Sequence, residues 1–196
     1  MKIKICGITN IEDAELSVKY GADYLGFIFA ESPRQIPADK CAEIIKTIKK
    51  TNVKSVGVFM NQPINFVMKT DKICDFDLIQ LHGNENVREY KSIFNKPVIK
   101  RVMNFENIQE CEYADYLLFD KTKFKDSILD LKILKTANFQ IPYFLAGGLN
   151  CENVSELLDD CKAFGLDVSS GIEKSPGKKD DIKLLKFINI AKNSTD

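Results

Sequence analysis

The feature of this sequence that most restricts its fold is the regular alternation of short apolar runs with longer amphipathic stretches. The apolar runs are rich in β-branched and aromatic residues, as is typical of strands that are buried on both faces. Eight such runs occur, at residues 3–8, 24–29, 55–60, 78–81, 98–102, 116–119, 143–146 and 165–168. Patterns of helical periodicity follow them at residues 11–20, 38–50, 64–73, 86–94, 105–111, 127–136, 151–159 and 179–191. The first helix is the best marked, because Asn10 can cap its start and Gly21 can end it.

Strict alternation of strands and helices predicts an α/β fold with a parallel sheet, because each helix returns the chain to the same edge. Such a sheet is either a closed (β/α)8 barrel or an open, doubly wound sheet. Eight complete units favour the barrel, although a chain of 196 residues is short for one. The sequence has no linker or low-complexity segment, so we expect one domain over residues 1–196.

Charge and composition argue against several classes of function. The 28 basic side chains are balanced by 28 acidic ones, so the chain has no net positive charge that would attract nucleic acid. No apolar run approaches the roughly 18 residues that a membrane span needs. The first six residues alternate lysine with apolar side chains and lack the apolar stretch of a secretory signal. We therefore expect a cytoplasmic protein that binds neither membranes nor nucleic acid.

The cysteines and the single histidine argue against a metal centre. Six cysteines are scattered along the chain with no C-x-x-C spacing, and a reducing compartment would keep them as thiols. His82 is the only histidine, and no clustered carboxylate motif accompanies it. We expect neither a zinc site nor a disulfide framework.

Polar residues lie where several of the predicted strands end. In a barrel of this type, the active site lies at the C-terminal ends of the strands. The residues at these ends are Cys6 after the first strand, Arg34 after the second, Gln80 and His82 after the fourth, and Asp120 after the sixth. We expect these side chains to meet on one rim of the barrel.

Glycines at the ends of the last two predicted strands indicate a phosphate site. Glycine lets successive backbone N–H groups converge on an anion near a helix N-terminus. A single pair of glycines is more often only a tight turn, but two such turns on neighbouring strands are far less ambiguous. The expected phosphate-binding residues are Gly147, Gly148, Asn150, Ser169, Ser170 and Gly171.

Taken together, these motifs resemble those of phosphoribosylanthranilate isomerases, which are enzymes of tryptophan biosynthesis. The resemblance runs from end to end, and the motifs have the family's order and spacing. They are Lys4–Thr9, Gly26–Phe29 with Ser32–Arg34, Gln80–Gly83, Gly147–Asn150, Asp167–Glu173 and Pro176–Asp180. The resemblance implies a TIM barrel of the phosphate-binding type.

It also implies an isomerase that carries out an Amadori rearrangement without a cofactor. The aminoaldose N-(5′-phosphoribosyl)anthranilate becomes the aminoketose 1-(o-carboxyphenylamino)-1-deoxyribulose 5-phosphate. This chemistry needs an acid that opens the furanose ring and a base that removes the C2′ proton. By resemblance, Asp120 is the acid and Cys6 is the base. A free cysteine is more often a buried core residue, and the sequence does not identify what would favour its thiolate.

The resemblance further implies contacts with the substrate. Arg34 matches the family's residue at the anthranilate end, where a planar guanidinium suits a carboxylate. Gln80, His82 and Asp167 match positions that line the family's pocket, although a histidine that ends a strand is often structural. The phosphate would be held by backbone and hydroxyl groups, so no lysine is required there.

One segment departs from the family. After the aspartate of strand six, the family usually carries a Gly-Gly-Thr-Gly stretch followed by an aromatic residue, Asp and Trp, in a loop that helps to cover the substrate. Here residues 121–129 follow Asp120 without these glycines and without Trp. We therefore expect a shortened loop after the sixth strand and weaker substrate binding than in relatives with the full loop.

The sequence leaves two other functions open. The turns after the last two strands are shared by other phosphate-binding barrels, such as sugar-phosphate epimerases and indole-glycerol-phosphate synthase, although Cys6 with Arg34 argues against these. A barrel that kept phosphate binding but lost turnover would show the same turns. Apolar helix faces serve barrel packing and dimer contacts alike, and we expect a monomer rather than a homodimer.

Overall fold

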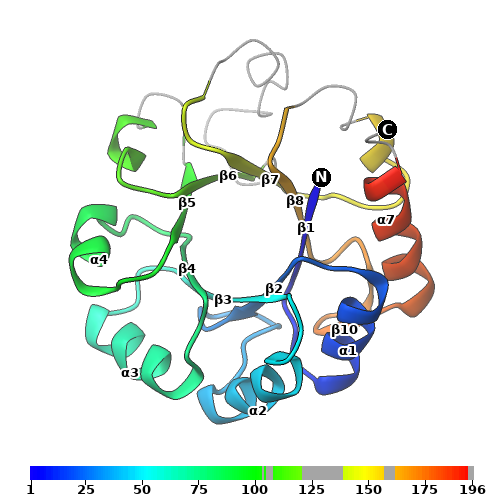
Figure 1. Ribbon diagram of the computed structural model, residues 1–196, viewed down its shortest axis with the longest axis horizontal. Coiled ribbons are helices and arrows are strands. Elements are labelled where there is room, and N and C mark those ends of the chain that lie inside the picture. Colours follow the sequence, from blue (N-terminus) through cyan, green and yellow to red (C-terminus); the bar gives the residue numbers. More distant parts are fainter. Residues whose placement is uncertain (103, 105–107, 121–138, 157–161, 194–196) are drawn as a thin grey trace.

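The computed structural model of this chain describes residues 1–102, 104, 108–120, 139–156 and 162–193. Its centre is a closed barrel of eight parallel strands, which follow one another around the ring in chain order (Figure 1). The closed barrel expected from eight repeating units is therefore confirmed, and the open sheet is excluded. The strands are β1 (Lys2–Cys6), β2 (Tyr24–Ile28), β3 (Lys54–Phe59), β4 (Leu78–Leu81), β5 (Val98–Val102), β6 (Tyr116–Asp120), β7 (Tyr143–Ala146) and β8 (Gly165–Val168).

The barrel closes where the first strand pairs with the last. β1 lies between β2 and β8, with Cys6 beside Gly26 on one side and Lys4 beside Asp167 on the other. Two residues that are far apart in the chain thus become neighbours. All strand pairs of the barrel are parallel, so the C-terminal ends of the strands open on the same face.

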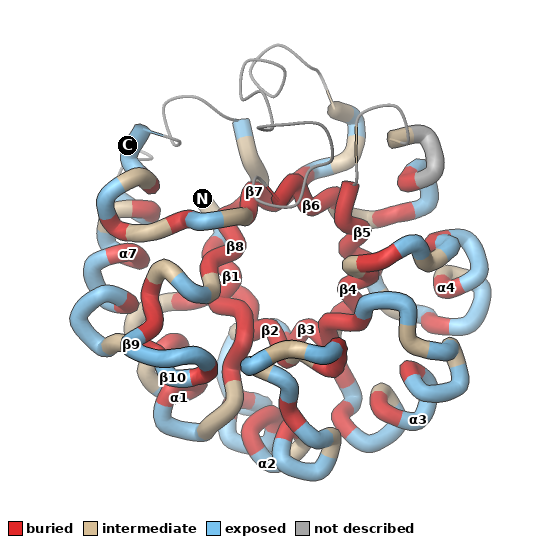
Figure 2. The backbone as a smooth tube through the Cα atoms, turned by 180° about the vertical axis from the view of Figure 1, so that it is seen from behind, coloured by how far each residue is buried: buried red, intermediate tan, exposed pale blue. Residues whose placement is uncertain are grey.

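Helices surround the barrel (Figure 1). Figure 2 shows that buried residues concentrate on the strands and on the inner faces of the helices, whereas exposed residues lie on the outer faces. No helix in the described ranges is long and apolar enough to cross a membrane. The helices are α1 (Ile11–Tyr20), α2 (Ala38–Ile48), α3 (Ile64–Cys74), α4 (Val87–Ile93) and α7 (Asp181–Asn193), together with the 3₁₀ helix η1 (Ile108–Cys111).

Both ends of α1 carry the signals that the sequence contains. The side chain of Asn10 accepts a hydrogen bond from the N–H of Asp13 at 2.8 Å, as an N-cap does. At the other end, Gly21 has φ 97°, and its N–H donates to the carbonyl oxygens of Ser17 and Val18. The predicted start and end of this helix are confirmed.

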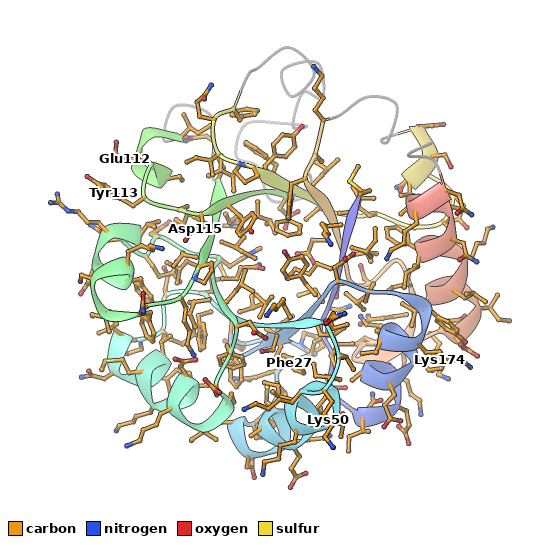
Figure 3. The ribbon with its side chains drawn as sticks, in the orientation of Figure 1. Phe27, Lys50, Glu112, Tyr113, Asp115 and Lys174 are labelled. Carbon is orange, nitrogen blue, oxygen red and sulfur yellow. The ribbon has the colours of Figure 1, made fainter. Side chains whose placement is uncertain are left out.

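Alternate residues of the strands contribute to two separate cores. In β7, Tyr143 and Leu145 pack in the outer core between strands and helices, whereas Phe144 and Ala146 belong to the core inside the barrel. Figure 3 shows side chains across the ring of strands, so the barrel has a packed interior rather than a channel. Charged side chains such as Lys50 and Lys174 are exposed.

Aromatic rings fill the barrel interior at the N-terminal ends of the strands. The ring centroid of Phe144 lies 5.4 Å from those of Tyr24 and Phe164 and 5.7 Å from that of Tyr116. Burial raises the pKa of Tyr24 to about 12, so its hydroxyl is neutral at physiological pH. This aromatic layer closes the interior at one end, and a ligand must approach from the C-terminal face.

The segment before α7 differs from the sequence-based expectation. A helix was expected from residue 179, but Lys178–Lys179 forms β10, which pairs antiparallel with β9 (Glu173–Ser175). The helix begins at Asp181, where the side chain of Asp180 accepts a hydrogen bond from the N–H of Lys183 at 3.0 Å. The helix therefore starts after its capping residue, Asp180. The periodic pattern of apolar residues in the sequence placed the start at residue 179, which is too early.

Several expected elements lie wholly or partly outside the described residues. The helix expected at residues 127–136 and the shortened loop at residues 121–129 lie outside them entirely. Of the helix expected at residues 105–111, residues 108–111 are described and form a 3₁₀ helix. Of the helix expected at residues 151–159, residues 154–156 are described as helical.

Replacing the glycine that ends α1 tests the capping analysis. We expect Gly21→Ala to lower the free energy of unfolding by about 1–2 kcal/mol, because an L side chain is strained at this positive φ. The new Cβ would meet only the flexible end of Lys192, so strain rather than a clash is measured. Gly21→Asn is the matched control and should lose less, since asparagine tolerates this conformation better. Urea unfolding measures all three proteins, and equal stability of Gly21→Ala and the wild type would contradict the analysis.

Candidate active site

A cavity of about 380 Å³ opens at the C-terminal ends of the strands, and we call it the barrel-mouth cavity. It brings together ten of the twelve residues that were expected to form the site, although they come from six different strand ends. Asn150 and Gly171 are the two that do not line it. The ten are Cys6, Arg34, Gln80, His82, Asp120, Gly147, Gly148, Asp167, Ser169 and Ser170.

Cys6 is the last residue of β1, and two glycines make room around it. A Cβ on Gly26, its neighbour in β2, would lie 2.8 Å from the Cys6 Sγ. Gly7 has φ 78°, and a Cβ there would lie 2.6 Å from the Cδ of Arg34. Each glycine therefore allows a close approach that any larger residue would prevent.

A buried ion pair lies beside Cys6, and the sequence analysis did not single it out. The Nζ of Lys4 lies 2.9 Å from the Oδ2 of Asp167, and Lys4 has no exposed surface. Burial would lower the pKa of Lys4, but the neighbouring Asp167 and Cys6 raise it above the ordinary value. Burial raises the pKa of Asp167, and Lys4 opposes this shift. The period of two in β1, which puts Lys4 and Cys6 on one face, is the signal that would have identified Lys4.

Glu173 joins Arg34 to a second buried lysine. The Nη2 and Nε of Arg34 donate to the Glu173 carboxylate at 2.7 and 2.9 Å, and Lys179 Nζ donates to it at 3.0 Å. Burial would raise the pKa of Glu173, but the hydrogen bonds from Arg34 and Lys179 lower it below the ordinary value. One edge of the Arg34 guanidinium is thus held by the protein itself. A ligand carboxylate has to approach this residue from its Nη1 end.

Asp120 ends β6 and reaches the cavity from a strand that is not adjacent to β1 in the ring. Its Oδ2 lies 3.8 Å from the Nε2 of His82, whose Nδ1 is 3.3 Å from the side-chain nitrogen of Gln80. The Nδ1 side of the imidazole thus faces Gln80, and its Nε2 side faces Asp120. Burial lowers the pKa of Arg101, near the end of β5, and the nearby Asp120 opposes this shift. The sequence analysis missed Arg101, because it does not lie in any of the motifs.

The turns after β7 and β8, which lie between β6 and β1 in the ring, line the cavity with backbone and hydroxyl groups. Gly147 and Gly148 have φ 93° and 68°, conformations that glycine adopts without strain. Ser169 and Ser170 follow β8 and line the same cavity. Two glycines in succession and two hydroxyl groups form a surface that is suited to an anion with several oxygen atoms.

The two expected residues that do not line the cavity have structural contacts instead. The Oδ1 of Asn150 accepts hydrogen bonds from the N–H groups of Glu152 and Asn153 at 2.9 and 3.0 Å. Gly171 forms a β-bridge with Asn150, and a Cβ on it would clash with the carbonyl oxygen of Leu149. Both residues shape the turns that follow β7 and β8, and their direct contact with phosphate stays a prediction.

Three buried polar atoms of the cavity lining have no hydrogen-bond partner among the described residues: Gln80 Oε1, Asp167 Oδ1 and Ser169 Oγ. An unpaired buried polar group costs about 1–3 kcal/mol, so most are paired in folded proteins. Three of them around one cavity indicate a ligand with several hydroxyl or phosphate groups. Within the described part of the chain, no group of three or more His, Cys, Asp or Glu side chains is placed to hold a metal ion.

The sequence of the chain matches the family described as N-(5′phosphoribosyl)anthranilate (PRA) isomerase over residues 3–190. The N-(5′-phosphoribosyl)anthranilate isomerase of Aquifex aeolicus (strain VF5) is 42% identical over 208 residues, which cover 98% of this chain and 99% of the relative. The enzyme of the same name from Geotalea uraniireducens (strain Rf4) is 38% identical over 201 residues, which cover 97% of this chain and 98% of the relative.

Solved structures of this family share the fold. The phosphoribosylanthranilate isomerase in complex with reduced 1-(o-carboxyphenylamino)-1-deoxyribulose 5-phosphate has a TM-score of 0.84 at 34% identity, with 98% of this chain and 99% of that chain covered. Monomers of the dimeric enzyme from Thermotoga maritima give a TM-score of 0.86 at 34% identity and the same coverage. The monomeric state expected for the present chain stays a prediction. The epimerase and synthase alternatives no longer apply, because the chain belongs to the N-(5′-phosphoribosyl)anthranilate isomerase family and is an isomerase of tryptophan biosynthesis.

Proposed function

We propose that the protein converts N-(5′-phosphoribosyl)anthranilate into 1-(o-carboxyphenylamino)-1-deoxyribulose 5-phosphate by general acid–base catalysis, with Asp120 as the acid and Cys6 as the base. The observation that carries this proposal is that the thiol of β1 and the carboxyl of β6 line one cavity. The strands that carry them are not adjacent in the ring, so a substrate can lie between the two groups.

The acid and the base act at neighbouring positions of the sugar. Asp120 donates a proton to the furanose ring oxygen, and the C1′–O bond breaks to give an open-chain iminium ion. Cys6 then removes the proton from C2′, and the electrons of the C–H bond form the C1′–C2′ double bond of an enolamine. Protonation of C1′ and loss of the proton from the 2′-hydroxyl give the ketone. Each of the two catalytic groups typically contributes about 10²–10⁴-fold to the rate.

Arg34 binds the carboxylate of the anthranilate group in this proposal. Glu173 holds the Nε and Nη2 atoms of Arg34, which orients the guanidinium and leaves its Nη1 end for the substrate. The hydrogen bonds that Arg34 donates to Glu173 raise the pKa of Arg34 further above an already high value, so its positive charge is permanent. A planar group that is oriented in advance loses little freedom when it binds a carboxylate.

The phosphate of the substrate binds at the turns after β7 and β8, and the hydroxyl groups of the sugar bind between them and the acid. Gly147, Gly148, Ser169 and Ser170 line that end of the cavity. The unpaired Oγ of Ser169 supports this placement, since its hydroxyl would donate a hydrogen bond to a phosphate oxygen. Elsewhere in the cavity, the Oε1 of Gln80 and the Oδ1 of Asp167 are unpaired acceptors for sugar hydroxyl groups. The Nε2 of His82 faces the carboxyl group of Asp120, and in this proposal it helps to orient the acid.

We also propose that the protein works in the cytoplasm. A thiol that acts as a base has to stay reduced, and the cytoplasm is a reducing compartment. The described cysteines Cys6, Cys41, Cys74, Cys111 and Cys151 are free thiols. Fractionation of the producing cells, followed by thiol titration of the native protein, tests this placement.

Substitution of the acid and of the base tests the mechanism. We expect Cys6→Ser and Asp120→Asn each to lower kcat by about 10²–10⁴-fold, because a hydroxyl is a far weaker base than a thiolate and an amide cannot donate as an acid. KM should change much less. Steady-state fluorescence assays with the purified enzymes measure the two constants, and each variant should also fail to restore growth without tryptophan in a strain that lacks the isomerase.

Cys74→Ser is the matched control for the loss of a thiol. Cys74 lies at the end of α3, away from the barrel-mouth cavity, and its Sγ is 3.3 Å from the carbonyl oxygen of Ala38. A serine hydroxyl can make the same contact, so this variant should restore growth. Turnover of Cys6→Ser within about tenfold of the wild type would rule out the thiol as the base.

The unpaired hydroxyl of Ser169 tests the phosphate site. We expect Ser169→Ala to raise KM by about 10–100-fold, because the variant loses one hydrogen bond to a charged group of the substrate. The free energy of unfolding should stay the same or rise, because the substitution removes a buried hydroxyl without a partner. Kinetic assays and urea unfolding measure the two effects. An unchanged KM would show that phosphate does not bind there.

Arg34→Lys tests the carboxylate contact. Lysine keeps the charge, but an ammonium group cannot hold the Glu173 carboxylate and a ligand carboxylate with a fixed planar fork. We expect KM to rise by about tenfold or more with kcat changed less, as for a contact made in both the bound substrate and the transition state. A KM within twofold of the wild type would argue against this role.

A further inference from the structure

The ammonium group of Lys4 lies inside the barrel, next to the thiol of Cys6. Lys4 has no exposed surface, and its Nζ donates to the Oδ2 of Asp167 at 2.9 Å. Lys4 and Cys6 are two residues apart in β1, so their side chains lie on the same face of the strand. A Cβ on Gly26 would lie 3.1 Å from the Lys4 Nζ and 2.8 Å from the Cys6 Sγ. The ammonium and the thiol therefore share the small space beside this glycine.

The other charges around Cys6 are largely engaged with one another. Lys179 donates to the Cys6 carbonyl oxygen at 2.6 Å rather than to its thiol, and it also binds the Glu173 carboxylate. Arg34 binds the same carboxylate. The charged groups that face Cys6 from the surrounding elements are Lys4, Asp167, Lys179 and Arg34. Of the three cations, Lys4 is the one whose ammonium lies beside the sulfur atom.

We propose that Lys4 is a positioning residue for the isomerisation: its ammonium is the counter-ion of the Cys6 thiolate and holds the Asp167 carboxylate at the cavity wall. This inference rests on the proposed role of Cys6 as base. Lys4 does not itself line the barrel-mouth cavity, so it acts through its two neighbours and not on the substrate.

Electrostatics gives the direction of the effect. Burial raises the pKa of Cys6 above that of an ordinary thiol, and Lys4 is the group that opposes this shift most. An opposite charge within about 4–6 Å typically changes a pKa by about 1–3 units. Burial would lower the pKa of Lys4, but Asp167 and Cys6 raise it, so the ammonium stays charged at neutral pH. Loss of this charge should make the thiolate rarer at every pH below the pKa of the thiol.

The test is the rate at which iodoacetamide alkylates Cys6, followed by peptide mass spectrometry between pH 7 and pH 10. The thiolate is the reactive form, and Cys6 lines the cavity, so the reagent can reach it. Lys4→Met keeps an unbranched side chain without the charge. Alkylation of Cys6 in this variant should be at least tenfold slower at pH 8 than in the wild type. The rising limb of the pH profile of kcat should move to higher pH, with KM changed less.

A further variant tests whether the effect is specific to the ammonium beside Cys6. Lys100→Met is the matched control, because it removes another buried ammonium, which lies on β5 and donates to the carbonyl oxygen of Gly83 at 2.6 Å. Its alkylation rate at Cys6 should equal that of the wild type.

Alkylation of Lys4→Met within twofold of the wild type would overturn the proposal. If circular dichroism shows that Lys4→Met does not fold, Lys4→Gln replaces it and the same criterion applies. Alkylation reports the thiolate whether or not Cys6 is the catalytic base. Turnover in Cys6→Ser together with the expected alkylation rates would therefore refute the proposed mechanism and leave the counter-ion role of Lys4 intact.

Discussion

The pairing of β1 with β8 is the constraint on which the rest of the structure depends. It closes the sheet into a barrel and places Lys4 beside Asp167, at the level where the apolar interior ends and the barrel-mouth cavity begins. In an open sheet, these two strands would be edges with unpaired backbone groups. Closure therefore pairs the backbone groups of both strands, and it also buries charged side chains, which interact more strongly there than in water.

Inside that space, charge is tolerated because each described charged group is close to a group of opposite sign. Lys4 lies against Asp167, and Glu173 lies between Arg34 and Lys179. Burying an isolated charge costs far more free energy than burying a pair of opposite charges. Removing one partner therefore lowers the stability of the protein by more than the net contribution of the ion pair. The aromatic layer lies at the N-terminal ends of the strands, and polar turns lie at the C-terminal ends of β7 and β8. Along the barrel axis, from the N-terminal to the C-terminal ends of the strands, the interior thus consists of an aromatic layer, then buried charged side chains, then the barrel-mouth cavity.

Much of the fold and of the site could be predicted from the sequence. The runs at residues 78–81, 98–102, 143–146 and 165–168 are strands with the predicted bounds, because residues buried on both faces produce continuous apolar runs. Strand-end residues such as Cys6 and Asp120 were expected on one rim, since parallel strands of a closed barrel end on the same face. Asn150 lies outside the cavity lining, and its Oδ1 accepts hydrogen bonds from backbone N–H groups of the following turn; its contact with phosphate stays a prediction.

The sequence by itself determined the number and order of the strands, the ends of α1, and which strands carry polar residues at their C-terminal ends. These follow from local periodicity and capping, which act over a few residues. Only the tertiary structure decided that Lys4 lies against Asp167, that Glu173 occupies one edge of Arg34, and that Lys178–Lys179 forms a hairpin strand instead of a helix. The first two depend on contacts between segments far apart in the chain. The third combines local pairing with β9 and the contacts of Lys179 with Asp13 and Cys6, and none of these contacts produces a periodic pattern in the sequence from which it could be predicted.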